Sequence, residues 1–335
     1  MSKIPQGIWP YPWLLLVALL LSSACSRPKA PEQLVFADPD NPIAALMYIA
    51  EAKGYFKDEN LTVAIKKVSS GRESSNSVTA GESDLALGSE YIFANDILQG
   101  KDLRILATLQ RTNQNNALVG RRDRGITSAA DLAGKKIGLT PNTNSDYILS
   151  VLAREAGIAD DAVTRVPLQP NQLVDALESG QVDAIFSWQP HVANAQARFP
   201  HDATVLLRPL SYSEITVIGV RAKTLVEKRE ALQRLVNALV RTEDFINTQR
   251  AEALQIAIAH LNLKPEVALE KSWAERVFHV RLDNLMLAAL ENEGAWLAGR
   301  INPSPAVPDY RAAFAAEFLQ AARPQSVTVT KAGGN

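Results

Sequence analysis

Short apolar runs alternate along the chain with longer stretches in which apolar residues recur at helical spacing. In the first hundred residues, three apolar runs are each followed by a polar loop and a helical pattern. We predict strands at 34–37, 62–68 and 84–88. Strands that alternate with helices form a mostly parallel sheet. Ligands bind beyond the carboxyl ends of such strands, so the loops at 38–42, 70–74 and 89–91 should meet at one edge.

A strand, a polar turn and a helix are predicted in the middle of the chain. The strand covers 136–139, the turn contains Thr140, and the helix begins near Asn144 or Ser145, whose side-chain oxygens can cap its free amides. The start of a helix offers unpaired N–H groups and the positive end of the helix dipole, so it can bind a small anion or a polar head group. An ordinary loop of an α/β protein would give the same local pattern.

The second half of the chain continues the alternation and then becomes helical. Further strands are predicted at 104–110, 117–120, 164–166, 182–186 and 211–220. Trp188 follows one of these strands, and Pro190 can begin the next helix. An aromatic side chain is therefore expected between the end of this strand and the start of the helix. From Ala222 onward the apolar positions have helical spacing, and this region should pack back on the first half. They include Leu232, Leu235, Val236 and Leu239.

The start of the chain has the pattern of a secretory signal. An apolar run at 13–21 is too short to span a membrane, and small residues follow it up to Cys25, the only cysteine. This arrangement resembles the bacterial lipoprotein signal, in which Cys25 would become the acylated first residue, although Leu21 lies one position earlier than the usual leucine. Residues 1–24 would then be the signal peptide and 25–32 a polar tether. The alternative is an ordinary cysteine after an uncleaved segment.

Size and charge narrow the class of protein. Without the predicted signal roughly 300 residues remain, enough for one large or two medium lobes. The chain has 35 Lys and Arg against 36 Asp and Glu, so it lacks the basic field that nucleic-acid binding needs. The 18 prolines and 17 glycines are spread without a repeat or a low-complexity block, which is typical of a compact globular protein.

Four motifs in a fixed order carry a family resemblance. They are AKGYFKDENLTV at 52–63, AGESDLA at 80–86, DLAGKKIG at 131–138 and ALESGQVDAI at 176–185. Together they resemble the solute-binding proteins of ABC importers, in the branch that includes binders of aliphatic sulfonates, taurine, nitrate and thiamine-pyrimidine precursors. The resemblance spans roughly residues 34–220.

The resemblance implies an α/β fold of the two-lobed periplasmic-binding-protein type II (Venus flytrap) class, with two crossover strands and a helical C-terminal region. We place the crossovers at 117–120 and 211–220. The expected domains are lobe I at 33–117 and 218–322, lobe II at 118–217, and a flexible tail at 323–335.

The resemblance also implies a role. The protein would be a monomer that captures a small polar organic molecule containing nitrogen or sulfur between its lobes and delivers it to an ABC permease and its ATPase. It would lie in the periplasm or another extracytoplasmic space, attached to a bacterial membrane through the lipid on Cys25. It would use no cofactor or metal, and nucleic acid would not be a partner.

The residues near the expected cleft suggest the chemistry of the solute. Several carboxylates lie at predicted loop or strand ends, whereas Arg72 is the only nearby cation. An excess of carboxylates favours a ligand with an amine, an amidine or a protonated ring nitrogen, because a buried unpaired anion is costly. Tyr91 and Trp188 could stack on a flat or cationic ligand. The residues expected to bind the ligand are Asp38, Asn41, Ser70, Gly71, Arg72, Glu90, Tyr91, Thr140, Thr143, Asn144, Ser145, Asp146, Trp188, Gln189 and Glu214.

Two other classes of function stay open. A receptor that presents its ligand-bound state to a membrane signalling protein would have the same sequence pattern. An enzyme of thiamine-pyrimidine synthesis is disfavoured, because the eukaryotic relatives with that activity carry a cysteine-rich motif and this chain has only Cys25. The four histidines are too far apart to form a local metal pair, and neither a phosphate loop nor a nucleophile elbow is present.

Overall fold

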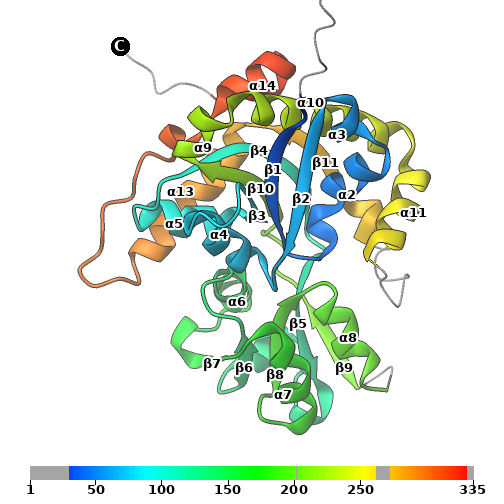
Figure 1. Ribbon diagram of the computed structural model, residues 1–335. Coiled ribbons are helices and arrows are strands. Elements are labelled where there is room, and N and C mark those ends of the chain that lie inside the picture. Colours follow the sequence, from blue (N-terminus) through cyan, green and yellow to red (C-terminus); the bar gives the residue numbers. More distant parts are fainter. Residues whose placement is uncertain (1–29, 201–202, 262–271, 330–335) are drawn as a thin grey trace, which may run out of the picture. The chain divides into compact units, whose positions relative to one another are not determined.

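The computed structural model describes residues 30–200, 203–261 and 272–329. The compact unit begins at Glu32 and contains two β-sheets (Figure 1). The predicted signal at 1–24, the proposed lipidation site Cys25 and most of the predicted tether lie outside the described residues. Within the described ranges, none of the helices combines the length and the hydropathy that crossing a bilayer requires.

The first sheet has six strands in the order β11-β4-β10-β3-β1-β2. Strand β1 pairs in parallel with β2 and β3, and β10 lies antiparallel between β3 and β4. The strands are β1 (Glu32–Asp38), β2 (Leu61–Lys67), β3 (Leu85–Ser89), β4 (Leu103–Thr112), β10 (Glu214–Arg221) and β11 (Val277–Arg281). The parallel strands predicted at 34–37, 62–68 and 84–88 are thus confirmed.

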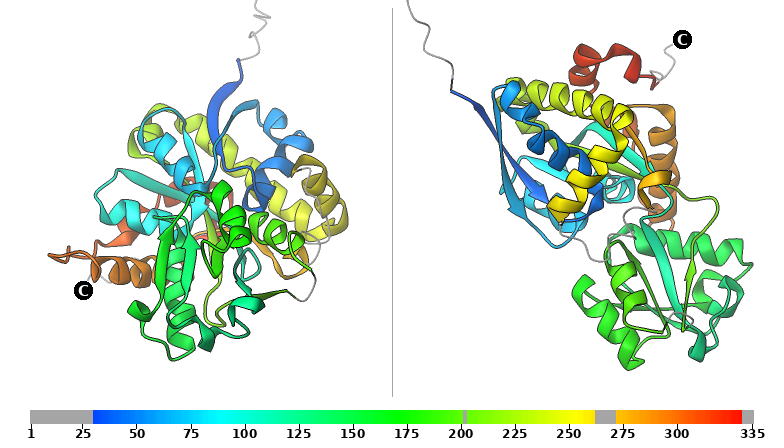
Figure 2. Two further views of the ribbon diagram at one scale, coloured as in Figure 1. Left: turned by 90° about the horizontal axis from the view of Figure 1, so that it is seen from below. Right: turned by 90° about the vertical axis from the view of Figure 1, so that its right-hand side faces the viewer.

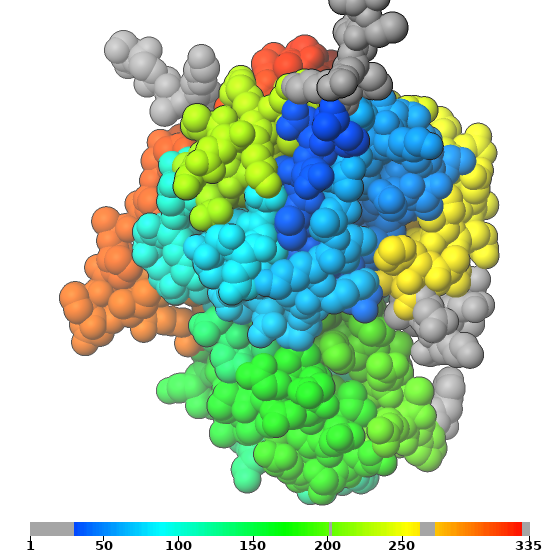
Figure 3. Space-filling view, viewed as in Figure 1, coloured from blue at the N-terminus to red at the C-terminus, as the bar shows by residue number. Residues whose placement is uncertain are grey.

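The second sheet has five strands in the order β7-β6-β8-β5-β9. They are β5 (Asn116–Arg121), β6 (Lys136–Leu139), β7 (Thr164–Pro167), β8 (Ala184–Trp188) and β9 (Thr204–Leu207). We call residues 32–112 and 214–329 the first lobe and residues 116–207 the second lobe, according to the sheet that each segment joins. Figure 3 shows the second lobe, largely green, meeting the blue and cyan surface of the first.

The chain passes between the sheets at residues 113–115 and 208–213, which we call the crossing segments. The first crossover therefore lies before the range predicted for it, 117–120, whereas the second, predicted at 211–220, overlaps its crossing segment at 211–213 and continues into β10. Strand β5 pairs along its length with β8 and β9, and β10 pairs along its length with β4, so each belongs wholly to one sheet. The predicted lobe boundaries after 117 and 217 shift by a few residues for the same reason.

Helices fill both lobes. In the first half of the chain they are η1 (Pro42–Ala44), α2 (Ala45–Ala52), α3 (Tyr55–Asp58), α4 (Gly71–Thr79) and α5 (Glu90–Leu98). In the second lobe they are η2 (Arg122–Arg124), η3 (Ala129–Leu132), α6 (Asn144–Glu155), η4 (Asp160–Ala162), η5 (Pro170–Gln172), α7 (Leu173–Ser179) and α8 (His191–Ala197). The C-terminal region has α9 (Ala222–Glu227), α10 (Arg229–Thr248), α11 (Arg250–Leu261), α13 (Asn284–Ala298), η6 (Tyr310–Ala313), α14 (Ala316–Ala322) and η7 (Pro324–Ser326).

Apolar side chains build a separate core in each lobe. Leu232 and Leu239 of α10 lie in one cluster with Leu34 of β1, which confirms that the C-terminal helices pack back on the first lobe. In the second sheet, side chains of β5 alternate between two faces. Leu118 packs with α6, whereas Val119 packs with α7 and α8 on the other face. The right-hand view of Figure 2 shows helices on both sides of this sheet.

Two expectations for the C-terminal region differ from the structure. The region is not helical throughout, because Val277–Arg281 forms strand β11 at the edge of the first sheet. The tail predicted to be flexible from residue 323 is held as far as residue 329. Arg323 pairs with Glu243 at 2.9 Å, and Leu282 exchanges backbone hydrogen bonds with Ser326 and Thr328. Residues 330–335 lie outside the described ranges.

Candidate functional site

A pocket lies where loops of the first lobe meet the second lobe and the first crossing segment. It encloses about 330 Å³, counting the space that opens to solvent. Its lining comes from the ends of β1, β2 and β3, the starts of α4 and α6, the end of β8 and the start of β10. The lining residues are Asn41, Ile43, Ser70, Gly71, Arg72, Ser89, Ile92, Asn115, Asn116, Thr143, Asn144, Trp188 and Glu214.

The start of α4 is fixed tightly against the end of β3. Ser70 caps the helix, since its hydroxyl accepts a hydrogen bond from the Glu73 amide at 3.2 Å. A Cβ on Gly71 would lie 3.0 Å from the Cα of Gly88 and 3.2 Å from the Leu87 carbonyl oxygen, so this close approach requires glycine. The amide end of α4 therefore faces the pocket in a defined position.

Arg72 is the one basic residue in the pocket lining, and its nitrogens have different environments. Its Nη1 donates to the buried carboxylate of Asp96 at 2.6 Å, and its Nε donates to the Asn142 carbonyl oxygen of the second lobe at 3.0 Å. Its Nη2 is buried and has no hydrogen-bond partner. A guanidinium nitrogen without an acceptor, next to a pocket, suits an oxyanion of a ligand.

Glu214 is the acidic residue in the pocket lining, and it contrasts with the basic Arg72. Its carboxylate is 3% exposed and accepts hydrogen bonds from the side-chain amides of Asn115 at 3.0 Å, Asn116 at 2.5 Å and Asn144 at 2.9 Å. Because a carboxylate only accepts, the amide N–H groups face it and the amide oxygens point elsewhere. The oxygens of Asn115 and Asn116 are buried without a partner, so this side of the pocket offers acceptors to an N–H group.

A fully buried arginine, Arg276, lies just before β11 and interacts electrostatically with Glu214. Burial lowers the pKa of Arg276 to about 10, while the Glu214 carboxylate opposes that shift. None of the three guanidinium nitrogens of Arg276 has a hydrogen-bond partner. The positive charge of Arg276 therefore partly balances the negative charge of the Glu214 carboxylate.

Eight of the predicted residues lie together in the pocket lining. They are Asn41, Ser70, Gly71, Arg72, Thr143, Asn144, Trp188 and Glu214. Trp188 is 7% exposed and contacts the His191 ring edge-to-face, with ring centroids 5.7 Å apart, so most of its surface is packed against the protein. At the start of α6, Thr143 rather than Asn144 or Ser145 is the cap. A direct role of these residues in ligand binding stays a prediction.

Three predicted carboxylates do not line the pocket, because each is already satisfied elsewhere. Asp38 accepts hydrogen bonds from the Tyr48 hydroxyl at 2.6 Å and the Lys67 ammonium at 2.8 Å. Asp146 pairs with Arg165 at 2.5 Å within the second lobe. Glu90 begins α5 and accepts from the Ile215 amide at 3.0 Å.

Four further predicted residues also lie outside the lining. Tyr91 packs against Tyr147, with ring centroids 6.2 Å apart. The Gln189 side-chain oxygen accepts from the Ala193 amide at 3.3 Å. Thr140 and Ser145 are buried, and their hydroxyls have no partner.

Five lining residues were missed by sequence reasoning: Ile43, Ser89, Ile92, Asn115 and Asn116. Ser89 lay in a loop that we expected to reach the cleft, and its buried hydroxyl has no partner. The two asparagines belong to a run of amide side chains at 113–116, which was an available signal. That run was overlooked because the first crossover was placed after it.

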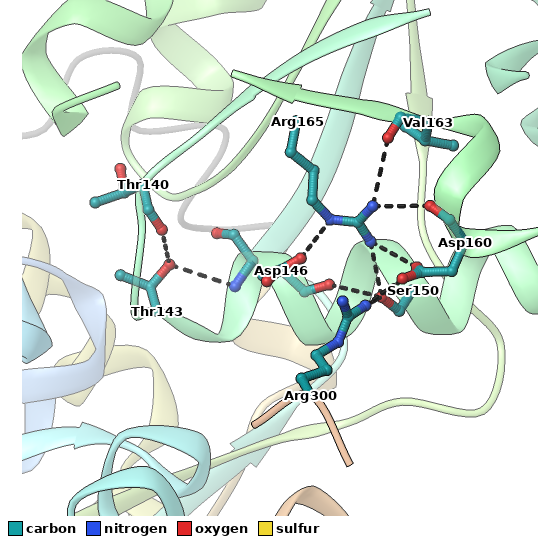
Figure 4. A network of polar contacts seen from close by, with 9 residues as sticks. Thr140, Thr143, Asp146, Ser150, Asp160, Val163, Arg165 and Arg300 are labelled. Carbon is teal, nitrogen blue, oxygen red and sulfur yellow. Dashed lines mark hydrogen bonds and ion pairs between the residues drawn. The ribbon is translucent and has the colours of Figure 1, made fainter. Parts of the chain in front are cut away.

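A polar network lies beside this pocket and joins the lobes (Figure 4). Arg165 binds Asp146 and, at 2.6 Å, Asp160. Arg300, which follows α13 in the first lobe, donates to the carboxylate of Asp160 and, at 3.1 Å, to the hydroxyl of Ser150. The Arg300 guanidinium also lies 4.1 Å from the centre of the Trp296 ring. The contacts of Arg300 with Asp160 and Ser150 join the two lobes, and we call them the latch.

The latch should affect lobe separation more than stability. Arg300→Gln is expected to change the unfolding free energy by less than about 1 kcal/mol, because partly exposed ion pairs contribute little. The radius of gyration from small-angle X-ray scattering should rise in the variant. In the wild type it should rise as the salt concentration goes from about 0.05 M to about 1 M, because salt screens the pair.

Arg311→Gln is a matched control for the latch, since Arg311 pairs with Asp309 within the first lobe at 3.0 Å. It should leave the radius of gyration unchanged. A wild-type radius that does not respond to salt, together with an unchanged Arg300→Gln variant, would show that Arg300 does not hold the lobes together.

Comparison with known proteins places the chain in a family. A family model described as "NMT1/THI5 like" matches residues 41–253, more than half of the chain. A "Putative binding protein" of Brucella abortus (strain 2308) is 27% identical over 186 residues, which are 52% of this chain and 56% of the relative. The taurine-binding periplasmic protein of Escherichia coli (strain K12) is 27% identical over 146 residues, 43% of this chain and 45% of the relative. The chain thus spans about half the length of these relatives.

Solved structures share the fold. The periplasmic aliphatic sulphonate binding protein SsuA of Escherichia coli superposes with a TM-score of 0.70 over 91% of this chain and 95% of its own, at 15% identity. The desulfurization enzyme DSZB superposes with a TM-score of 0.64 over 88% of this chain and 99% of its own, at 20% identity. Both binding proteins and an enzyme therefore use this architecture, which is the predicted periplasmic-binding-protein fold. On the extent of the family match, the chain belongs to the NMT1/THI5-like family.

Proposed function

We propose that this protein is the solute-binding component of an ABC importer and that it captures a small polar organic molecule in the pocket between its lobes. The observation that carries the proposal is the composition of that pocket. Both lobes and the first crossing segment contribute to it, so a bound solute would join parts that can move apart. The names of the taurine-binding and sulphonate-binding relatives support the same role.

The two sides of the pocket define a class of solute. The free Nη2 of Arg72 and the Ser89 hydroxyl suit an oxyanion, and Glu214 with the amide oxygens of Asn115 and Asn116 suits a protonated amine or another N–H group. A zwitterion with both groups, such as an aminosulfonate, satisfies both sides. The sequence alone favoured a nitrogen-containing ligand, and the free nitrogen of Arg72 adds the anionic group.

Delivery and location complete the proposal. The solute-bound form would dock on an ABC permease with its ATPase, and the protein would act as a monomer in the periplasm or another extracytoplasmic space. A lipid on Cys25 would attach it to the membrane. The function requires no bond to be made or broken, since retention and release of the solute suffice.

A thermal-shift panel tests the solute class. Taurine, ethanesulfonate, ethylamine and an aminopyrimidine would each be added to the purified protein. We expect taurine to raise the unfolding midpoint more than ethanesulfonate or ethylamine, because only the zwitterion uses both sides of the pocket. A ligand at a hundred times its Kd stabilises by about 2.7 kcal/mol, which is readily measured. Equal shifts with taurine and with one of its halves would contradict the two-sided pocket.

A further inference from the structure

A second cavity lies between the lobes, beside the latch. It encloses about 850 Å³, counting the space that opens to solvent. Its lining is formed by the later turns of α6, by the segment that follows α6 as far as Asp160, and by Trp296 of α13 in the first lobe. Among the described residues, none lines both this cavity and the first pocket. A concave space of this size is typical of a site for a small molecule.

Aromatic and apolar side chains form one part of this lining. The ring centroids of Tyr147 and Trp296 are 5.3 Å apart, and the two rings are nearly perpendicular. Both side chains are half-buried, so part of each ring stays accessible from the cavity. Val151 and Ile158 add apolar surface. This part of the cavity suits the flat, apolar body of a ligand, because an aromatic ring can pack against it.

Guanidinium groups lie beside the rings. Arg300 covers the Trp296 ring at 4.1 Å and forms the latch through its Nη2 alone, so its Nε and Nη1 have no hydrogen-bond partner among the described residues. Arg154 lines the cavity from the last turn of α6 and is exposed. Within the described part of the chain, its side chain forms no ion pair. Free guanidinium donors suit an oxyanion.

The acceptors around the cavity are already in use. The Asp160 carboxylate accepts from the side chains of two arginines, Arg165 and Arg300. Glu155, which follows Arg154, accepts from two backbone amides of the second crossing segment at 2.8 Å and 2.9 Å. The last carbonyl groups of α6 accept from the amides of residues 156–158. The cavity therefore offers donors rather than acceptors to a ligand, which favours an anion over a cation.

We propose that this cavity is a second ligand site, which binds a flat organic anion, such as an aromatic carboxylate or sulfonate, between Trp296 of the first lobe and Arg154 of the second. The ring of the ligand packs against Trp296 and Tyr147, and its oxyanion accepts hydrogen bonds from Arg154. Because one contact comes from each lobe, the bound anion holds the lobes together.

Helix α6 connects this site to the first pocket. Its first residue, Asn144, lines the first pocket, whereas its later turns line the second cavity. A ligand in the cavity therefore also fixes one wall of the first pocket. The second site does not require that the first pocket binds a solute, and so it goes beyond the proposed function.

Binding of 2-naphthoate, measured by isothermal titration with the purified protein, tests the ligand class. Cyclohexanecarboxylate keeps the negative charge but lacks the aromatic ring, and 2-naphthylmethylamine keeps the ring but is a cation. We expect 2-naphthoate to bind about tenfold more tightly than either, because only this compound makes both the aromatic contact and the charge-assisted hydrogen bond. Failure of 2-naphthoate to bind, or equal binding of the three compounds, would overturn the proposal.

Variants of each lobe test the position of the site. Trp296→Ala and Arg154→Gln should each weaken 2-naphthoate binding by about threefold or more. Arg311→Gln is the control for the loss of one positive charge, and Arg72→Lys is the control for the first pocket. Both controls should bind 2-naphthoate as the wild type does. If Trp296→Ala does not fold, Arg300→Gln replaces it as the first-lobe variant, because Arg300 covers the Trp296 ring.

Two outcomes with these variants would contradict the site. If Arg72→Lys weakens 2-naphthoate binding and Arg154→Gln does not, the probe lies in the first pocket. If only the first-lobe variant or only Arg154→Gln weakens binding, the anion rests on one lobe and does not join the two. Neither outcome depends on whether taurine or another solute binds, so the proposed function is tested separately.

Discussion

Replacing Glu214 with glutamine is expected to weaken solute binding by at least about thirtyfold. Removing one partner of a buried charge pair costs about 2–5 kcal/mol, because the other charge stays buried and unpaired. The protonated amine of the solute would lose its carboxylate. The remaining amide also has only one acceptor oxygen, whereas Glu214 now accepts from Asn115, Asn116 and Asn144.

Folding stability should fall as well in Glu214→Gln, because the buried charge of Arg276 loses its partner. The lost hydrogen bonds to a charged group would each be worth about 1.5–3 kcal/mol. The substitution also removes a negative charge that raises the pKa values of Glu90 and Glu293, and this relief offsets part of the loss. Isothermal titration with the compound that gives the largest thermal shift, together with urea unfolding, measures both effects.

The control for this variant is Glu291→Gln, which removes the same charge at an exposed position. It should bind as the wild type does. Unchanged affinity in Glu214→Gln would mean that the carboxylate serves only to order the three asparagines, and the amine side of the proposed solute would then be wrong.

Local patterns were sufficient to predict the elements that surround the pocket. The loops after β1 and β2 were found because each follows a short apolar run, and the ends of parallel strands lie at one edge of a sheet. Asn41 and Arg72 lie in the lining for that reason. Strand β11 was missed because its five residues are surrounded by helical sequence and its pairing partner, β4, is more than 160 residues away.

The direction of individual side chains could not be predicted in the same way. Asp38, Glu90 and Asp146 lie on the expected loops, but each points to a partner that the sequence does not reveal. Those partners are Tyr48, Tyr212 and Arg165, at sequence separations of 10, 122 and 19 residues. A carboxylate that finds such a donor away from the pocket is lost to the ligand site, and only tertiary structure decides this.

Two pocket residues were missed because the first crossover was predicted a few residues too late in the chain. Placing the first crossover at 117–120 instead of 113–115 put Asn115 and Asn116 on the wrong side of the boundary. Asn115 in fact orients Glu214 from the crossing segment, and Asn116 does so from the start of β5. The chemistry of the solute was consequently judged without the side-chain amides that order Glu214.

Arg72→Lys is expected to weaken binding of a sulfonate-bearing solute by roughly ten- to a hundredfold, while folding is retained. Lysine keeps the positive charge and can still pair with Asp96, which also binds Lys101 at 2.7 Å. It cannot at the same time bond the Asn142 carbonyl oxygen and present a planar donor to an oxyanion. Losing the hydrogen bond from Arg72 to the neutral carbonyl oxygen of Asn142 should lower the unfolding free energy by about 1 kcal/mol.

Arg229→Lys is the matched control, because the Arg229 side chain is 63% exposed and its ion pair with Glu317 is long, at 3.6 Å. Titrations with taurine, ethanesulfonate and ethylamine separate the two sides of the pocket. Arg72→Lys should weaken the first two and spare ethylamine, whereas Glu214→Gln should weaken taurine and ethylamine and spare ethanesulfonate. If Arg72→Lys instead weakens all three equally, Arg72 acts through its bond to Asn142 of the second lobe, and the oxyanion side of the pocket must lie elsewhere.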